Sequence, residues 1–212
     1  MVTIVLVVAI VLASFFVLGL VLGTSAPIRV VESGSMCIHV DGCDGLSHPF
    51  DPTLHVGDVI IIQQVDPKDL NANYPNSDII VYLNPTVMGN SKVTPIVHRI
   101  VAEYTVNGTL YFQTKGDGNC VPWPNPVNSS QYDSNTLWTT GQGVPQDQVL
   151  GRVVMRIPYL GLITLFMNAN SWVLPAVVGV IILIIILQFI LPIAKAKKNK
   201  RLKQQKHEGT LV

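Results

Sequence analysis

Two uncharged apolar runs, one near each end of the chain, limit what this sequence can fold into. The runs cover residues 2–23 and 173–194, and Gln188 is the only strongly polar side chain in the second one. Each run is long enough to cross a hydrocarbon core of about 30 Å as a helix. We therefore predict two transmembrane helices, at 2–23 and 173–194, that bracket one extracytoplasmic domain, residues 24–172.

Charge predicts the orientation of this two-pass chain. The domain carries seven Lys and Arg against twelve Asp and Glu, whereas the tail, residues 195–212, is strongly basic. Cations beside a span stay on the cytoplasmic side, so both termini are expected in the cytoplasm of a cell membrane or endoplasmic-reticulum membrane protein. The tail is interpreted as a topology signal that contacts anionic lipid, and no nucleic acid partner is expected. Its cations are Lys195, Lys197, Lys198, Lys200, Arg201, Lys203 and Lys206.

The first run has a second interpretation, a signal peptide that is removed. No basic region precedes it, and it exceeds the roughly 7–15 apolar residues of a signal-peptide core. Both features favour a retained anchor, although the small residues 23–26 resemble a cleavage site.

The domain between the runs is predicted to be mainly β. β-Branched segments bounded by Gly, Pro, Asn and Asp are typical of strands, and Asn107-Gly108 between two such segments predicts a hairpin. Residues 117–143 form a long loop, and residues 158–172 a short amphipathic link to the second run. Strands are expected within 28–33, 56–65, 77–83, 94–106, 109–116 and 141–161.

Three side chains in this β domain suggest acyl-transfer chemistry. Ser33-Gly34-Ser35-Met36 places two hydroxyls in a flexible turn after a strand, and a serine needs a base to become a nucleophile. His98 lies among β-branched residues, on the face of its strand that Ile96 and Ile100 also occupy. If the hairpin pairs without a bulge, Asp117 lies opposite His98 and could orient it. Each signal taken alone is more typical of a structural residue than of a catalytic one.

Five short segments, taken in order, resemble the conserved boxes of type I signal peptidases of the archaeal and endoplasmic-reticulum branch. They are SGSM (33–36), GDVIII (57–62), IVHRIV (96–101), TKGDGN (114–119) and DQVLGRVVMRIPYLG (147–161). The resemblance implies a membrane-bound serine endopeptidase in which Ser35 is the nucleophile and His98 the general base. It also implies an oxyanion hole made by the Ser33 hydroxyl and the Ser35 backbone N–H.

The same resemblance implies the substrate and the partners. The substrate would be the signal peptide of a secreted preprotein, cut after small residues at −1 and −3 and bound as an added strand near residues 28–33. The partners would be the lipid bilayer and the secretion-translocation machinery. No cofactor and no metal are expected.

The chain departs from the family pattern at two places. Pro52-Thr53-Leu54, which normally follows Ser-Met almost directly, comes after an insertion at residues 37–51. The position of a second acid, about six residues after Asp117, holds Trp123. Asp133 is a candidate replacement in the longer loop, so Asp117 and Asp133 both remain candidates for the acid partner of His98.

The cysteines of the insertion leave several interpretations open. Cys37 and Cys43 could form a disulfide in an extracytoplasmic domain, they could remain free thiols, or either could pair with Cys120. Together with His39 and His48 they could also bind zinc, although this spacing matches no common zinc pattern. The sequons at Asn107 and Asn128 are further signs of an external domain.

Two other functions compete with the peptidase. The missing second acid and the insertion are compatible with a non-catalytic binding or assembly module on the same scaffold. A sortase-like cysteine transpeptidase would use His98, Cys120 and Arg152, but Cys120 follows a turn and not a strand.

Overall fold

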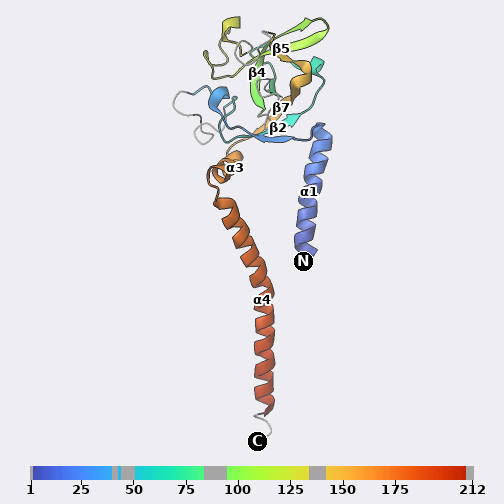
Figure 1. Ribbon diagram of the computed structural model, residues 1–212, viewed down its shortest axis with the longest axis vertical. Helices are drawn as coiled ribbons and strands as arrows, with labels where there is room; N and C mark the ends of the chain where they lie inside the picture. Colours follow the sequence, from blue (N-terminus) through green and yellow to red (C-terminus); the bar gives the residue numbers. More distant parts are fainter. Residues whose placement is uncertain (1, 40–42, 44–50, 84–94, 134–141, 209–212) are drawn as a thin grey trace. The chain divides into compact units, whose positions relative to one another are not determined.

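A computed structural model describes residues 2–39, 43, 51–83, 95–133 and 142–208. The chain divides into two compact units, Met1–Leu165 and Phe166–Val212 (Figure 1). The first unit contains the β domain and every predicted site residue. His48, most of the insertion, part of the long loop and the end of the tail lie outside the described residues.

The first unit is built on one antiparallel sheet of seven strands, which confirms the mainly β prediction. The strand order is β1-β2-β7-β3-β4-β5-β6, so β1 and β6 are the two edges. Figure 1 shows the strands curling into a compact domain. The strands are β1 (Ile28–Val30), β2 (Val59–Gln63), β3 (Ile79–Tyr82), β4 (Ile96–Val106), β5 (Thr109–Lys115), β6 (Val144–Pro145) and β7 (Val149–Ile157).

Side chains of both faces of the sheet are buried, in two separate hydrophobic clusters. Along β3, Ile80 and Tyr82 belong to one cluster, whereas Val81 between them belongs to the other. This alternation follows from the period of two in a strand. The second cluster also includes Met36 and Leu54, which lie outside the strands. Packing of these two side chains anchors the segments on either side of the insertion.

β4 and β5 form the predicted hairpin. Asn107 and Gly108 both have positive φ, at 50° and 81°, as a two-residue type I′ turn requires. Val106 pairs with Thr109 next to the turn, and the register then shifts between Ile100 and Ala102. The extra residue is a β-bulge, and it moves every later pair by one position.

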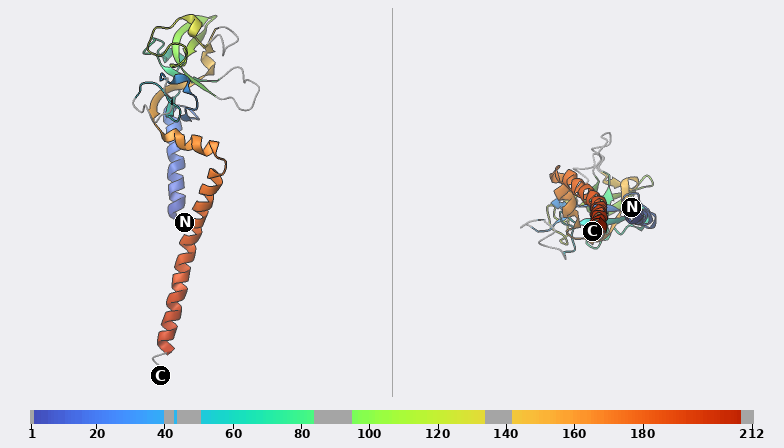
Figure 2. Two further views of the ribbon diagram at one scale, coloured as in Figure 1. Left: turned by 90° about the vertical axis from the view of Figure 1, so that its left-hand side faces the viewer. Right: turned by 90° about the horizontal axis from the view of Figure 1, so that it is seen from below.

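Helices flank the sheet domain in the sequence. They are α1 (Val2–Leu22), α3 (Leu160–Ala169) and α4 (Val173–Glu208), with short 3-10 helices η1 (Gly34–Met36), η2 (Pro67–Asp69), η4 (Ser129–Gln131) and η5 (Gln146–Gln148). α3 lies where the amphipathic link was expected. Figure 2 shows α4 as one continuous helix, which extends past residue 194 into the basic tail and contains Pro192.

The helices differ in length and in hydropathy. Within the described residues, no single helix meets the requirement for crossing a membrane. Leu6–Leu22 is a shorter apolar helix, and Leu160–Ala169 with Val173–Gln188 meets the requirement only as a pair interrupted by a bend.

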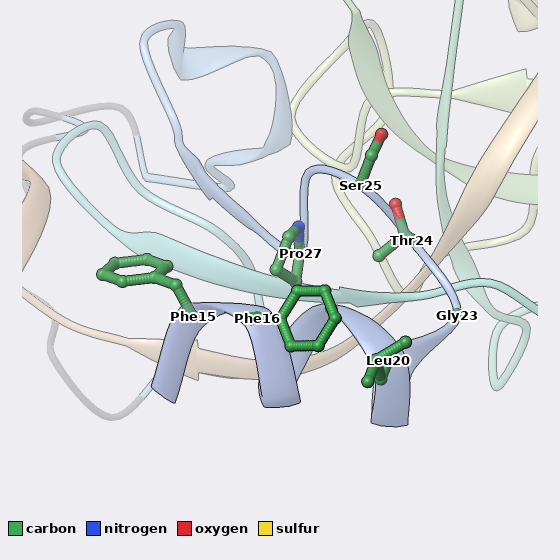
Figure 3. Close-up of a pocket in the computed structure, with 8 residues that line it drawn as sticks. Phe15, Phe16, Leu20, Gly23, Thr24, Ser25 and Pro27 are labelled. Carbon is green, nitrogen blue, oxygen red and sulfur yellow. The ribbon is translucent and has the colours of Figure 1, made fainter. Parts of the chain in front are cut away.

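Backbone hydrogen bonds connect the end of α1 to the sheet. The Thr24 amide donates to Gly19 O at 3.2 Å, and the Gln64 amide at the end of β2 donates to Leu22 O at 2.9 Å. Figure 3 shows a pocket at this junction, which is lined by Phe15, Phe16 and Leu20 of α1 and by Thr24 and Pro27 of the segment that leads into β1. The chain therefore enters β1, and then the serine turn, from a fixed point.

Candidate active site

Ser35 lies in η1, a single turn that follows β1. Ser33 before the turn is extended, with φ −122° and ψ 154°, and Met36 at its end is fully buried. The buried Met36 holds the turn on the sheet, while the Ser35 side chain stays partly accessible. The Ser33 and Ser35 hydroxyl oxygens lie 3.3 Å apart.

His98 lies on β4, opposite Ile80 of β3, and its ring joins two polar groups. Its Nε2 is 2.9 Å from Ser35 Oγ, and its Nδ1 is 2.5 Å from Asp133 Oδ2. His98 is 6% and Asp133 8% exposed, so water has little access to this pair. The three side chains are thus hydrogen-bonded in series across segments that are far apart in the sequence.

Asp133 reaches His98 because its backbone is tied to β5. Its amide donates to Thr114 O at 2.8 Å, directly after η4. The Thr114 hydroxyl in turn lies 3.0 Å from the buried Tyr82 hydroxyl. Burial raises the pKa of Tyr82, so this phenol stays protonated and able to donate. Sequence reasoning reached Asp133 only through the family resemblance, because a long loop precedes it.

Asp117 lies beside Arg99 and not beside His98. Both carboxylate oxygens of Asp117 accept from the guanidinium, from Nε and from Nη2 at 2.8 Å each. The assumed register without a bulge, which placed residue 117 opposite His98, is wrong by one residue. With the bulge near Val101, Arg99 pairs with Lys115. The turn after Lys115 therefore brings Asp117 next to Arg99.

Trp123 contacts the Arg99–Asp117 pair, at the position where the family pattern has an acid. The Arg99 guanidinium carbon lies 5.0 Å from the centre of the Trp123 ring, a cation–π contact. The Trp123 amide donates to Asp117 O at 2.8 Å, and its indole N–H donates to Pro75 O at 2.8 Å. Trp123 therefore encloses the ion pair and holds the loop after β5.

Lys115 is a buried cation that sequence reasoning missed. It is 2% exposed, and its Nζ donates to Gly116 O at 2.9 Å and to Val121 O at 2.7 Å. Burial lowers the pKa of this amine, while the charges of Asp117 and Asp133 oppose the shift. A Lys directly before Gly-Asp was the available signal, but a strand-end lysine is ordinarily solvated.

Two glycines bring this loop against the serine turn. The Gly118 amide donates to Ser35 O at 3.0 Å. A Cβ on Gly116 would lie 2.4 Å from Ser35 O, and a Cβ on Gly118 would lie 1.8 Å from Cys37 O. Only residues without a side chain allow this approach, so the loop helps to fix the Ser35 backbone.

A groove of about 610 Å³ opens beside Ser35 and His98. Its walls come from β1 and the residues after it, together with parts of β2, β3 and β4. β1 is an edge strand, so its outer backbone groups can pair with an added strand. The residues that line the groove include Val30, Val31, Ser33, Ile96, Val97 and Thr164.

The described part of the insertion contains a disulfide and a polar cluster. Cys37 and Cys43 are joined, with their Cα atoms 5.6 Å apart, so neither sulfur is a free thiolate that could bind zinc. Among the described cysteines Cys120 is a free, exposed thiol. His39 contacts Asp51 and belongs to a cluster with His55.

The arrangement of side chains defines a class of protein. A hydroxyl, an imidazole and a carboxylate in series, next to a groove at a sheet edge, are the groups that serine hydrolases place around a scissile carbonyl. The described residues within hydrogen-bond distance of the His98 ring are Ser35 and Asp133, and Cys120 is not among them.

Comparison with known proteins specifies the family. The chain is 30% identical over 174 residues to a signal peptidase complex catalytic subunit SEC11 from Leptosphaeria maculans, covering 81% of this chain and 80% of the relative. A SEC11 from Pyricularia oryzae is 28% identical over 185 residues, with 85% and 88% covered. A third, from Verticillium alfalfae, is 26% identical over 172 residues, with 81% of each chain covered. No family model matches the chain.

The chain belongs to the family of signal peptidase catalytic subunits, the Ser-His branch of the type I signal peptidases. This family consists of hydrolases that act on peptide bonds, as the sequence resemblance implied.

Proposed function

We propose that this protein is a membrane-bound serine endopeptidase that removes signal peptides from secreted preproteins. The observation that carries the proposal is the hydrogen-bonded series Ser35–His98–Asp133 beside the groove. Ser35 is the nucleophile, His98 the general base and Asp133 the carboxylate that orients the imidazole. Asp117 is a positioning residue, because its carboxylate is taken up by Arg99.

The geometry suits proton transfer from Ser35 to His98. At 2.9 Å, Nε2 can take the hydroxyl proton while Oγ attacks the carbonyl carbon of the scissile bond. Asp133 accepts from the Nδ1–H, which fixes the tautomer and stabilises the imidazolium that forms. The imidazolium then donates its proton to the leaving amine, and a water molecule, deprotonated by His98, releases the acyl group from Ser35.

The negative oxygen of the tetrahedral intermediate needs donors close to Ser35. The Ser33 hydroxyl lies 3.3 Å from Ser35 Oγ and can rotate toward that oxygen. The Ser35 backbone N–H is the second donor in this proposal. Ser33 directly precedes η1, and Ser35 lies within it. The buried Met36 and the hydrogen bond from the Gly118 amide keep this turn in place.

The substrate binds as an extended strand along the free edge of β1. Alternate side chains of such a strand point the same way, so residues −1 and −3 enter the groove together. The groove is bounded by apolar side chains such as Val31 and Val97, beside Ser35. We propose that this limits −1 and −3 to small residues.

Membrane attachment follows from the two apolar ends of the chain. Along α1, large apolar side chains are exposed all around the helix, for example Leu12 at 64% and Phe16 at 68%. Ile181 and Leu183 of α4 are exposed in the same way, at 51% and 55%. Such surfaces are satisfied by lipid. We therefore retain transmembrane segments 2–23 and 173–194, with an extracytoplasmic domain 24–172 and a cytoplasmic tail 195–212.

The partners in this proposal are the lipid bilayer, the preprotein and the machinery that delivers it. The relatives are named as catalytic subunits of a signal peptidase complex, which suggests that other subunits accompany this chain in a cell or endoplasmic-reticulum membrane.

A catalytically inactive assembly module is the second candidate, because Trp123 stands in place of an acid. Asp133 supplies a carboxylate to His98 in this structure, which favours an active enzyme. The cysteine transpeptidase hypothesis is weaker, since the thiol of Cys120 is exposed and Arg152 pairs with Asp78 at 3.5 Å.

Cleavage of a model preprotein in membranes tests the proposed function. Ser35→Ala removes the nucleophile and should abolish cleavage, whereas Ser33→Ala should lower kcat by about 100-fold through loss of one oxyanion donor. Ser171→Ala, an exposed serine between α3 and α4, is the matched control and should cleave normally. Normal cleavage by Ser35→Ala would refute the proposed function, and so would a wild type that never reacts with a serine-directed covalent probe.

A further inference from the structure

A second cluster of polar side chains lies at the base of the insertion. One nitrogen from each of His39 and His55 and one carboxylate oxygen of Asp51 lie within 4.8 Å of one another. His55 Nε2 is 3.4 Å from Asp51 Oδ2, and His39 Nε2 contacts the same oxygen. The two imidazole rings are stacked, with centroids 5.9 Å apart and planes at 23°. Three ligand-type atoms therefore converge on one point.

One spacing in this cluster, between His55 Nε2 and Asp51 Oδ2, already matches that of two ligand atoms on a tetrahedral metal. Zinc bonds to imidazole nitrogen and carboxylate oxygen are about 2.0–2.2 Å long, which places neighbouring ligand atoms roughly 3.4 Å apart. The His55–Asp51 distance is already 3.4 Å. A metal ion needs only to replace the direct His39–Asp51 contact with two coordinate bonds. His39 can move to allow this, because its side chain is 29% exposed.

The other two ligands are held rigidly by the β domain. His55 is completely buried, and its backbone N–H donates to Asp58 Oδ2 at 2.7 Å. The Arg156 guanidinium, from β7, donates to the backbone oxygens of Asp51 and Thr53. Asp51 therefore presents its carboxylate from a fixed backbone, as a pre-organised metal site requires.

The electrostatic surroundings favour a divalent cation. His55 lies beside two carboxylates, and Asp51 Oδ2 is 3.4 Å from its Nε2. Asp58 Oδ2 lies 3.9 Å from His55 Nδ1, and the same oxygen pairs with Arg156 Nε at 2.8 Å. Because Arg156 Nε pairs with Asp58, the Asp51 carboxylate is the anionic group that contacts both imidazoles.

We propose that His39, Asp51 and His55 form a binding site for one divalent transition metal ion, with zinc as the first candidate. Two histidines and a carboxylate are ligands that suit zinc, and a water molecule would complete the tetrahedron. The site differs from the cysteine-containing set considered from the sequence, because Cys37 and Cys43 are bonded to each other.

The metal would close the insertion at its base. His39 lies before and Asp51 after the part of the insertion that is outside the described residues, and His55 lies in the segment that leads into β2. A single ion would therefore fasten both ends of the insertion to the β domain, a few residues after Ser35. This role is structural and does not depend on the proposed peptidase activity.

Metal content of the purified full-length protein in detergent tests the site. After chelation and reloading with Zn²⁺, elemental analysis should find one ion per chain. Loading with Co²⁺ should give the visible absorption of a tetrahedral site without a thiolate charge-transfer band. His39→Ala and Asp51→Asn remove one ligand each and should weaken Zn²⁺ binding by about tenfold or more. Both side chains are partly exposed, so these variants should fold.

Two further variants exclude other binding sites. His98→Ala removes the imidazole beside Ser35, and His48→Ala removes the other histidine of the insertion; both should bind Zn²⁺ as the wild type does. The proposal is overturned by less than half an ion per chain in the wild type, by unchanged affinity in His39→Ala, or by a thiolate band in the cobalt spectrum. Loss of binding in His98→Ala would also overturn it, since the ion would then sit at the peptidase site.

Discussion

His98 and Arg99 are neighbours on β4, and each is paired with a different carboxylate. Successive side chains of a strand leave on opposite faces, so His98 meets Asp133 while Arg99 meets Asp117. The two acids are both nearly buried, at 8% and 2% exposed. We nevertheless expect Asp133 to contribute to the reaction and Asp117 to contribute to stability.

Replacing each acid by its amide separates these contributions. Asp133→Asn keeps the shape but offers His98 the wrong hydrogen-bond partner, and kcat should fall by roughly 10³–10⁴-fold with little loss of stability. Asp117→Asn leaves the Arg99 guanidinium buried without its counter-charge, and the free energy of unfolding should fall by about 3–5 kcal/mol. Preprotein cleavage and thermal unfolding of the two proteins check both.

The reverse pattern would contradict this assignment. If Asp117→Asn lost catalysis while keeping wild-type stability, Asp117 and not Asp133 would be the acid that serves His98.

At the scale of elements, the loop that follows β5 acts as a support for the serine turn. The Gly118 amide donates to Ser35 O, and Lys115 ties the same loop together through Gly116 O and Val121 O. The loop and the serine turn meet through their backbones, so the contact requires glycine at positions 116 and 118.

Gly118→Ala tests this support. The new Cβ would lie 1.8 Å from Cys37 O, so the serine turn and the loop must separate. A displacement of about 1 Å at the nucleophile costs roughly 100-fold in rate, and we expect such a fall in kcat. Gly179→Ala, where a Cβ meets nothing within 4 Å, is the control. A Gly118→Ala protein that cleaves at the wild-type rate would show that the contact is dispensable.

At the scale of the whole molecule, the proposed topology depends on the order of apolar helix, β domain, apolar helix and basic tail. In the proposed topology the β domain faces outward, where its edge strand is available to a signal peptide. The exposed thiol of Cys120 is a natural probe of this arrangement, since Cys37 and Cys43 are already bonded to each other.

A membrane-impermeant maleimide should therefore label Cys120 in intact cells or in vesicles with the outer side exposed. A Cys120→Ser, Lys203→Cys protein carries its thiol in the tail and should be labelled only after permeabilisation. Labelling of the tail in intact cells would contradict the proposed topology, because it would place the C-terminus outside.

Much of the fold could be predicted because the signals are local. The β-branched segments gave the strands within two or three residues at most ends, and the Asn107-Gly108 hairpin formed where its backbone preference required it. The strand face of His98 also followed from the period of two, since its partner Ile80 belongs to the cluster that includes Ile100. Each of these depends on interactions between residues a few positions apart.

The site was harder to predict from the sequence, because it depends on contacts between distant segments. Ser35 and His98 are 63 residues apart, and the family resemblance supplied the pair that the structure brings to 2.9 Å. The choice between Asp117 and Asp133 turned on one bulged residue in β4 and on the path of a long loop. The position of Lys115 directly before Gly-Asp was too weak a signal to show that its amine is buried and not solvated.

By itself, the sequence determined the apolar ends, the charge asymmetry, the mainly β domain and the hairpin, because side-chain period and turn chemistry act over short distances. Only the tertiary structure decided which carboxylate meets His98, which meets Arg99, and that His39, Asp51 and His55 converge beside the insertion. Those pairings depend on sheet register and loop packing, where a shift of one residue exchanges one partner for another.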